Sequence, residues 1–119
     1  MKKQLKKIEP QVTSIALAEN TERKMPGMRY DKGFNNMDVM IPLNGKGTIT
    51  ITIDLGDASK EAFVKGIKDS VDKHAAEAWK LAQQSNRFKE VGVSEENLKE
   101  GILEAARRYE KLHSIYSKK

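Results

Sequence analysis

Strict alternation of apolar and polar residues marks one segment of the chain as a β-strand. Residues 48–55 have the sequence Thr-Ile-Thr-Ile-Thr-Ile-Asp-Leu, which places the isoleucines and the leucine on one face and the threonines on the other. A second apolar segment, residues 37–41, precedes this strand, and the Asn44-Gly45 pair between them readily adopts positive φ. The pattern therefore predicts a β-hairpin over residues 37–55.

The chain before this hairpin has weaker patterns. Residues 12–18 favour a first strand, with Thr13, Ile15 and Leu17 on one face. Residues 20–34 contain Pro26-Gly27 and further turn-forming residues, so the segment is loop-like, and the sequence leaves open whether it forms a strand, a loop or a lid.

After Asp57, the period of the apolar residues changes from two to alternating steps of three and four. We expect Asp57 to begin a helix that runs to about Val91, Gly92 to break it, and Ser94 to cap a second helix. Such spacing forms a seam like that of a coiled coil, and two seams joined by a short turn predict an antiparallel helical hairpin. The expected seam positions are Val64, Ile67, Val71, His74, Ala78, Leu81, Ser85 and Phe88 in the first helix, and Leu98, Ile102, Ala105, Tyr109, Leu112 and Tyr116 in the second.

These elements predict an α+β fold in a single domain, residues 1–119. A basic arm (1–10) precedes a β region (11–56), in which an antiparallel sheet contains the hairpin, and a long antiparallel helical hairpin (57–119) follows. Because the seams are long relative to the small sheet, we expect a second copy of the chain to cover part of them. The sequence thus predicts a homo-oligomer.

Composition excludes several kinds of site. The chain has 119 residues and no cysteine, so it has no disulfide, no thiolate metal site and no cysteine nucleophile. With only two histidines, we expect no metal site and no cofactor. No apolar run is long enough to cross a membrane, and Glu9-Pro10-Gln11 follows the basic N-terminus where a signal peptide would be apolar. We expect a cytoplasmic protein without a membrane partner.

No motif in the sequence indicates a reaction. Gly45-Lys46-Gly47-Thr48 is too short for a phosphate-binding loop and leads into a strand, so a hairpin turn is favoured. Glu110 and His113 have the spacing of a di-metal carboxylate helix, but the second motif that such a site requires is absent from the sequence. His74 lies on the apolar seam, where a hydrogen-bonded packing role is expected. We therefore predict that the protein is not an enzyme.

Positive charge gives the best indication of a ligand. The formal net charge is +5, with lysines near the N-terminus and a basic cluster that includes Arg107, Arg108 and Lys111 near the C-terminus. Arginine binds phosphate through its planar fork, and an aromatic side chain such as Trp79 or Phe88 could stack on a base. In the alternative interpretation, both aromatic residues belong to the core and the basic residues are solvated.

The order of elements resembles that of the Thoeris anti-defence protein 1 family of phages. The resemblance covers most of the chain and lies in the architecture. It implies an oligomer, in the cytoplasm of a bacterial host, that sequesters an anionic nucleotide immune signal, either of the cyclic ADP-ribose type or a cyclic oligonucleotide, without cleaving it. The family's second helix carries two arginines one turn apart, whereas here Lys111 stands one turn from Arg107. The residues that match the family's ligand-binding positions in kind are Arg29, Phe88, Arg107 and Arg108, either Asn86 or Asn97, and Lys111 in place of the second arginine.

Other functions also fit the sequence. The basic termini suit a small nucleic-acid-binding protein of a phage or mobile element. A protein-binding inhibitor of host defence is a further alternative, although a basic chain does not mimic DNA. The long seams alone would also suit an assembly protein without a ligand.

Overall fold

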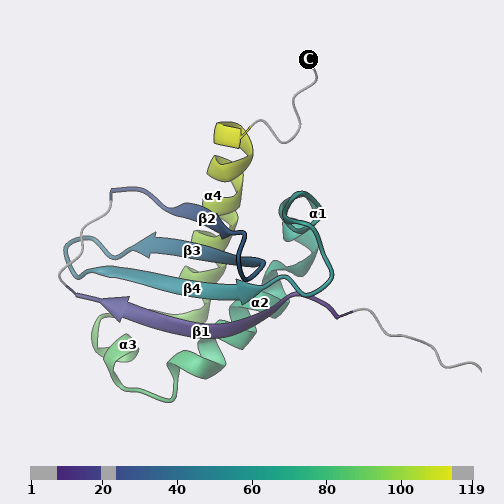
Figure 1. Ribbon diagram of the computed structural model, residues 1–119. Helices are drawn as coiled ribbons and strands as arrows, with labels where there is room; N and C mark the ends of the chain where they lie inside the picture. The colour runs from purple at the N-terminus through teal and green to yellow at the C-terminus, as the bar shows by residue number, and fades with distance from the viewer. Residues whose placement is uncertain (1–7, 20–23, 114–119) are drawn as a thin grey trace, which may run out of the picture.

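Residues 8–19 and 24–113 are described by the computed structural model, in which β-strands precede helices (Figure 1). This order confirms the predicted α+β class. The elements are β1 (Gln11–Ala18), β2 (Gly27–Asp31), β3 (Asn36–Pro42), β4 (Thr48–Asp54), α1 (Lys60–Lys65), α2 (Ile67–Ala82), α3 (Arg87–Glu90) and α4 (Glu95–His113).

The strands form one antiparallel sheet in the order β1-β4-β3-β2. The central pair is the predicted hairpin, and its turn uses positive φ at Asn44 (46°) and Gly45 (84°). The turn is closed by Leu43, whose amide donates to the Gly47 carbonyl at 2.9 Å. The alternating pattern of residues 48–55, the apolar segment 37–41 and the Asn44-Gly45 turn therefore predicted both strands of this hairpin correctly.

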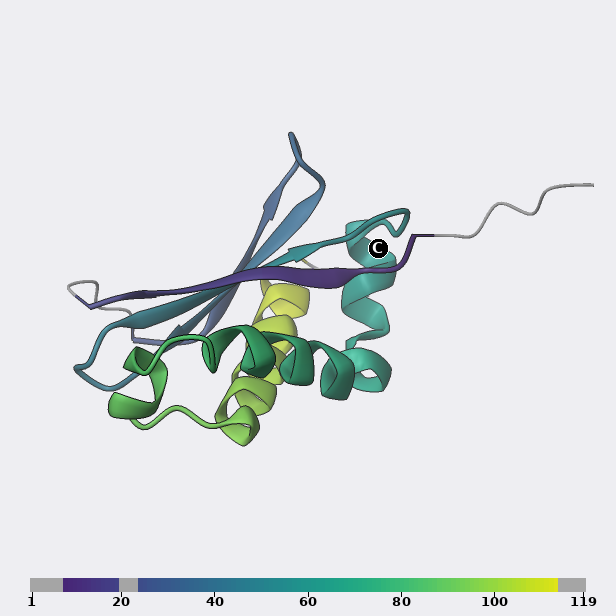
Figure 2. The same cartoon turned by 90° about the horizontal axis from the view of Figure 1, so that it is seen from below.

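All of the larger helices lie on one face of this sheet. Figure 2 shows α2 and α4 on the same side of the sheet, at an angle to each other. The isoleucines of β4 are fully buried there, as are Met37 and Val39 of β3. Among the described residues, no helix lies over the other face of the sheet, which carries the threonines (Figures 1 and 2).

The structure adds two features to the first 34 residues. The loop-like segment, for which a strand was left open, contains β2, which pairs with β3 from Gly27 to Asp31. The expected face of β1 is also shifted, because the pairing with β4 skips Thr13, as in a β-bulge. Val12 is therefore buried instead of Thr13, while Ile15 and Leu17 pack against the core as expected.

The first long helix is divided into three. Ser59, and not Asp57, caps it by accepting a hydrogen bond from the Ala62 amide at 3.0 Å. Gly66 separates α1 from α2, and α2 ends at Ala82. A single continuous helix from Asp57 to Val91 was therefore a wrong prediction.

The second helix agrees with the sequence more closely. The Ser94 hydroxyl accepts from the Asn97 amide at 3.2 Å, and the Asn97 side chain accepts from the Ser94 amide at 3.0 Å. This reciprocal pair is a capping box, which begins α4 where the sequence predicts. Gly92, with φ of 82°, ends the preceding α3 as expected.

The helical seams are buried within one chain. Nearly every described seam position is at most 6% exposed; Leu81 and Ser85 are half-buried, Leu112 is 75% exposed, and Tyr116 lies outside the described residues. Helices α2 and α4 contact each other and, between them, strands β1, β2 and β3. Uncovered seams are therefore no longer a reason to expect an oligomer, and any self-association needs another surface.

Candidate functional site

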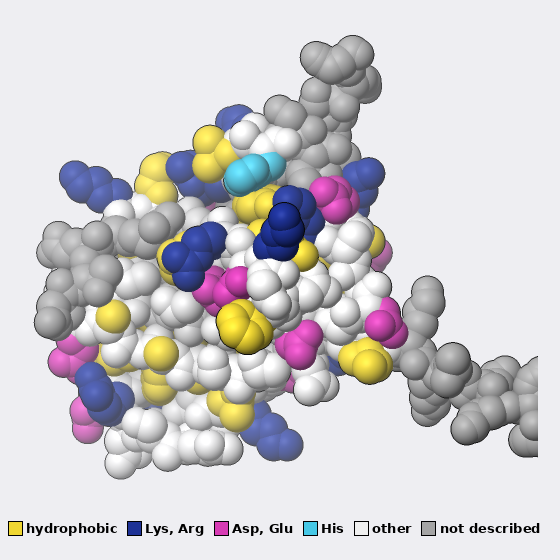
Figure 3. All heavy atoms as spheres, in the orientation of Figure 1, with side chains coloured by type: hydrophobic (Ala, Val, Ile, Leu, Met, Phe, Trp, Pro, Cys, Tyr) yellow, Lys and Arg dark blue, Asp and Glu magenta, His cyan; other side chains and the backbone are white. Residues whose placement is uncertain are grey.

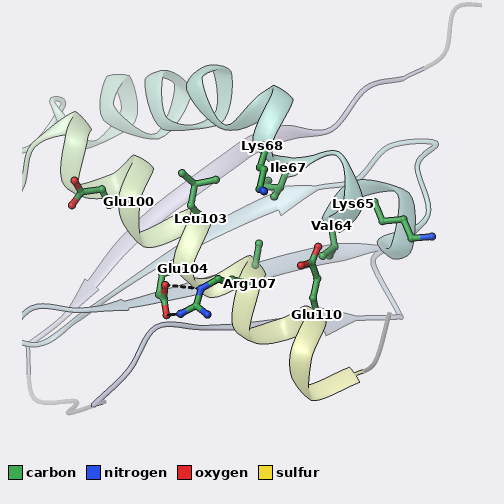
Figure 4. A pocket seen from close by; sticks show the side chains of 10 residues that line it. Val64, Lys65, Ile67, Lys68, Glu100, Leu103, Glu104, Arg107 and Glu110 are labelled. Atoms are coloured by element: carbon green, nitrogen blue, oxygen red, sulfur yellow. Dashed lines mark hydrogen bonds and ion pairs between the residues drawn. The ribbon is translucent and has the colours of Figure 1, made fainter. Parts of the chain in front are cut away.

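A cavity between the first two helices and α4 is the best-formed candidate site. We call it the α1–α4 groove; its volume is about 570 Å³ (Figure 4). The floor is apolar, and Val64 and Ala106 within it are almost completely buried. Charged side chains from both sides form the rim. The lining residues are Val64, Lys65, Ile67, Lys68, Glu100, Leu103, Glu104, Ala106, Arg107 and Glu110.

Arg107 and Glu104 form a two-pronged ion pair on the rim. The Arg107 Nε donates to Glu104 Oε1 at 3.1 Å, and its Nη2 donates to Oε2 at 2.5 Å (Figure 4). The pair forms readily because the two residues are three apart on α4 and lie on one side of it. Arg107 is 62% exposed and Glu104 37% exposed, so water and other solutes reach both groups.

Glu104 stands at a concentration of positive charge. Hydrogen bonding from Arg107 holds the pKa of the Glu104 carboxyl below its usual value, and the charges of Arg107, Arg108 and Lys111 lower it further. Arg107, in turn, has its pKa raised by Glu104. Three basic residues that the sequence singled out therefore act on one carboxylate.

The groove has the size and character of a site for a small molecule. Ligand sites in proteins usually have about 300–1,000 Å³, a mostly apolar lining and a few polar groups. Figure 4 shows the side chain of Lys65 pointing away from the cavity and that of Glu110 reaching toward Val64. Three acidic and three basic residues line it, so the rim as a whole is nearly balanced in charge.

The chain matches no protein-family model, no curated protein and no solved structure. No relative therefore assigns a role to any residue, and a candidate function rests on the geometry of this chain. Among the described residues, no helix combines the length and apolar character needed to cross a membrane.

Arg29, Phe88 and Asn86 lie away from the groove. Arg29 is on the opposite face of the sheet, where its Nη2 donates to Asp38 Oδ2 at 2.9 Å. Phe88 of α3 is 6% exposed and belongs to the core, so it offers no face to a base. Asn86 precedes α3 and is exposed. The structure therefore does not bring the seven residues into one pocket.

Asn97 lies closer to the groove. Its side chain is engaged in the capping box of α4 and also lines a neighbouring hollow of about 450 Å³ beside the β3–β4 turn. That hollow shares Glu100 and Glu104 with the α1–α4 groove. The two hollows are thus adjacent along α4.

His74 confirms its predicted packing role. It is 1% exposed, its Nδ1 lies 3.5 Å from Glu77 Oε1, and its ring lies 5.6 Å from that of Phe63. Burial lowers its pKa, so the ring is neutral near pH 7. Across residues 8–19 and 24–113, no cluster of three or more His, Asp or Glu side chains could hold a metal ion.

Sequence reasoning missed Glu104 and the apolar floor of the groove. The Glu104–Arg107 spacing was visible, because residues three apart on a helix are neighbours. The floor was not visible, because Val64 and Leu103 come together only when α1 and α4 pack on the sheet. The ion pair could therefore be predicted from residue spacing along one helix, whereas the cavity depends on the tertiary packing of two helices.

Proposed function

We propose that this protein is a non-enzymatic binding protein whose α1–α4 groove takes a small ligand with an apolar part and one anionic group. The observation that carries the proposal is the Arg107–Glu104 pair at the rim of an apolar cavity. A phosphate or carboxylate of the ligand would replace Glu104 on the Arg107 fork, while the apolar part would lie over Val64 and Leu103.

This exchange is energetically reasonable because the pair is exposed. Exposed ion pairs contribute little to stability, so separating Arg107 from Glu104 costs little. An anionic ligand would also interact with Arg108 and Lys111, whose charges already act on Glu104. The site would therefore favour a ligand with one localised negative charge over a neutral one.

Nucleotides are the first ligand class to test. The resemblance to the Thoeris anti-defence protein 1 family supports cyclic ADP-ribose isomers and cyclic oligonucleotides, and thus a role as a phage protein that sequesters an immune signal. The balanced rim favours ligands with few phosphates, because Glu100 and Glu110 would oppose further negative charge. Native mass spectrometry of protein purified from infected cells would identify a co-purified ligand.

Isothermal titration with these nucleotides tests the site itself. We expect Arg107→Ala to abolish binding and Arg108→Ala to weaken it, whereas Arg87→Ala, an exposed arginine outside the groove lining, should leave it unchanged. Glu104→Gln should bind several-fold more tightly, because the competing carboxylate is neutralised. A non-enzymatic protein should also release the ligand unchanged on heating. No heat with either the wild type or Glu104→Gln would contradict the proposal.

A further inference from the structure

The two edges of the sheet differ in how they are protected. Strand β1 is one edge, with eight residues and neither a charged residue nor a proline from Gln11 to Ala18. Strand β2 is the other edge, with five residues that include Arg29 and Asp31. Natural sheets protect their edges with short strands and charged side chains, because an open edge pairs with other strands. By this criterion, β2 is protected and β1 is open.

Figure 3 shows the same asymmetry on the open face of the sheet. Charged side chains are more frequent over β2 and β3 than over β4 and β1, where white and yellow atoms predominate. The outward-facing residues of β1 on this side are Ser14, Ala16 and Ala18, all small and exposed. Neither bulk nor charge on this face keeps another strand away from β1.

The direction of the free backbone groups follows from the hydrogen bonds of the sheet. The Leu55 amide donates to the Asn35 carbonyl at 3.0 Å, which marks a hydrogen-bonded pair between β4 and β3. Successive residues of a central antiparallel strand direct their backbone amides and carbonyls alternately toward the two neighbouring strands. Leu55 bonds toward β3 and Thr50 lies an odd number of positions from it, so the backbone groups of Thr50 point toward β1. Its partner there is Ala16. The amides and carbonyls of Ile15 and Leu17 consequently point outward from the sheet.

We propose that β1 pairs with β1 of a second copy, antiparallel and centred on Ala16. The outward groups of Ile15 then meet those of the partner's Leu17, and the reverse pair follows by symmetry. On the helix side, the half-buried Ile15 and Leu17 of each chain lie opposite one another and are withdrawn from water. The result is a continuous eight-stranded sheet from two four-stranded ones.

The structure also limits this pairing. The Val12 amide already donates to Glu77 Oε1 at 3.0 Å, and the bulge at Thr13 interrupts the strand. Pairing is thus confined to Ser14–Ala18, a short contact that predicts a dimer dependent on concentration. Because β2 is protected, association stops at two chains and does not extend into a filament. This surface is separate from the α1–α4 groove and does not depend on any ligand.

Disulfide trapping tests the geometry, because the chain contains no cysteine. Opposed residues of a pair without hydrogen bonds have Cα atoms about 4.5 Å apart, within the reach of a disulfide. Ala16→Cys should therefore form a covalent dimer rapidly on mild oxidation. Far less covalent dimer should form with Ala18→Cys, because in this register Ala18 does not lie opposite Ala18 of the second copy. The same holds for Ala76→Cys, which replaces an exposed alanine of α2.

Sedimentation velocity tests the dimer without a cross-link. The wild type should shift from the 13.4 kDa monomer toward twice that mass as concentration rises. Ala16→Lys should weaken the dimer about fivefold, because two lysines would face each other across the axis. Ala76→Lys is the matched control and should not weaken the dimer.

Leu17→Pro should abolish the dimer, because it removes two inter-chain donors while an edge strand tolerates proline at such a position. Circular dichroism checks that each variant is folded. A dimer that persists in Leu17→Pro overturns the proposal. A wild type that stays monomeric, with Ala16→Cys cross-linking no faster than Ala76→Cys, also overturns it and leaves the edge to a strand of another protein.

Discussion

Helices α2 and α4 cover the same face of the sheet but are attached to it in different ways. Helix α4 approaches β3 closely at Gly101, where an added Cβ would lie 2.5 Å from the Ile41 Cδ1. Helix α2 is held to β1 by polar groups as well as apolar ones. Glu77 accepts a hydrogen bond from the Val12 amide at 3.0 Å and lies 3.5 Å from the buried His74 ring.

Because of this difference, one contact of the core is sensitive to side-chain volume and the other is sensitive to pH. The α4 contact depends on shape, so it is sensitive to a single methyl group and indifferent to pH. The α2 contact includes the buried His74 ring, whose pKa is lowered by burial, so it is sensitive to pH. Gly101 and Ile41 line the hollow next to the α1–α4 groove. The open β1 edge lies beside the second contact, between α2 and β1.

The largest loss of stability is expected at the contact between α4 and β3, which depends on shape. Gly101→Ala places a methyl group against Ile41, which must move or force α4 away from β3. Overpacking of this kind costs about 1–3 kcal/mol. Urea unfolding monitored by circular dichroism would measure the loss.

The double variant supplies the control. Ile41→Ala removes the atoms that the new methyl group meets, so Gly101→Ala should cost much less in that background. If Gly101→Ala costs the same with and without Ile41, the close approach of α4 to β3 is not the cause.

A smaller loss of stability is expected at the contact between α2 and β1, which depends on hydrogen bonds. Glu77→Ala leaves the Val12 amide and His74 Nδ1 without their acceptor, which should cost about 1–2 kcal/mol. Asp72→Ala is the matched control on the same helix. Its carboxylate pairs with Lys99 of α4 at 2.9 Å but is 82% exposed, so its loss should change stability little. Equal losses in the two variants would contradict a special role for Glu77.

How far the sequence predicts this fold depends on how local each signal is. Residues 48–55 were assigned correctly because strict alternation is a property of the segment itself. Strand β2 was left undecided because Gly27–Asp31 has few apolar residues and becomes a strand by pairing with β3. The break at Gly66 was missed because the apolar spacing continues across it, from Val64 to Ile67.

The candidate site was less predictable than the fold. Arg107 was identified from residue type, and the structure places it on the rim of a cavity. Phe88 was chosen by the same reasoning and is a core residue, because a sequence does not show which aromatic side chains the sheet will cover. The oligomer stays a prediction, but the helical seams no longer support it because they are buried within one chain.

The smallest expected effect is the pH dependence of the α2 contact. Burial lowers the pKa of His74 below its usual value of 6.5, although Glu77 partly opposes this. As the pH falls below about 6.5, the unfolded chain takes up a proton at this residue before the folded protein does. The free energy of unfolding should therefore be unaffected above that pH and decrease below it, by at most about 1.4 kcal/mol per pH unit.

His74→Gln should remove this decrease, whereas His113→Gln should retain it, because His113 is exposed at the end of α4. Urea unfolding of the three proteins between about pH 7.5 and 5 would separate them. If His113→Gln flattened the pH dependence and His74→Gln did not, the buried ring would not be the titrating group. The polar attachment of α2 would then be no more sensitive to pH than the apolar attachment of α4.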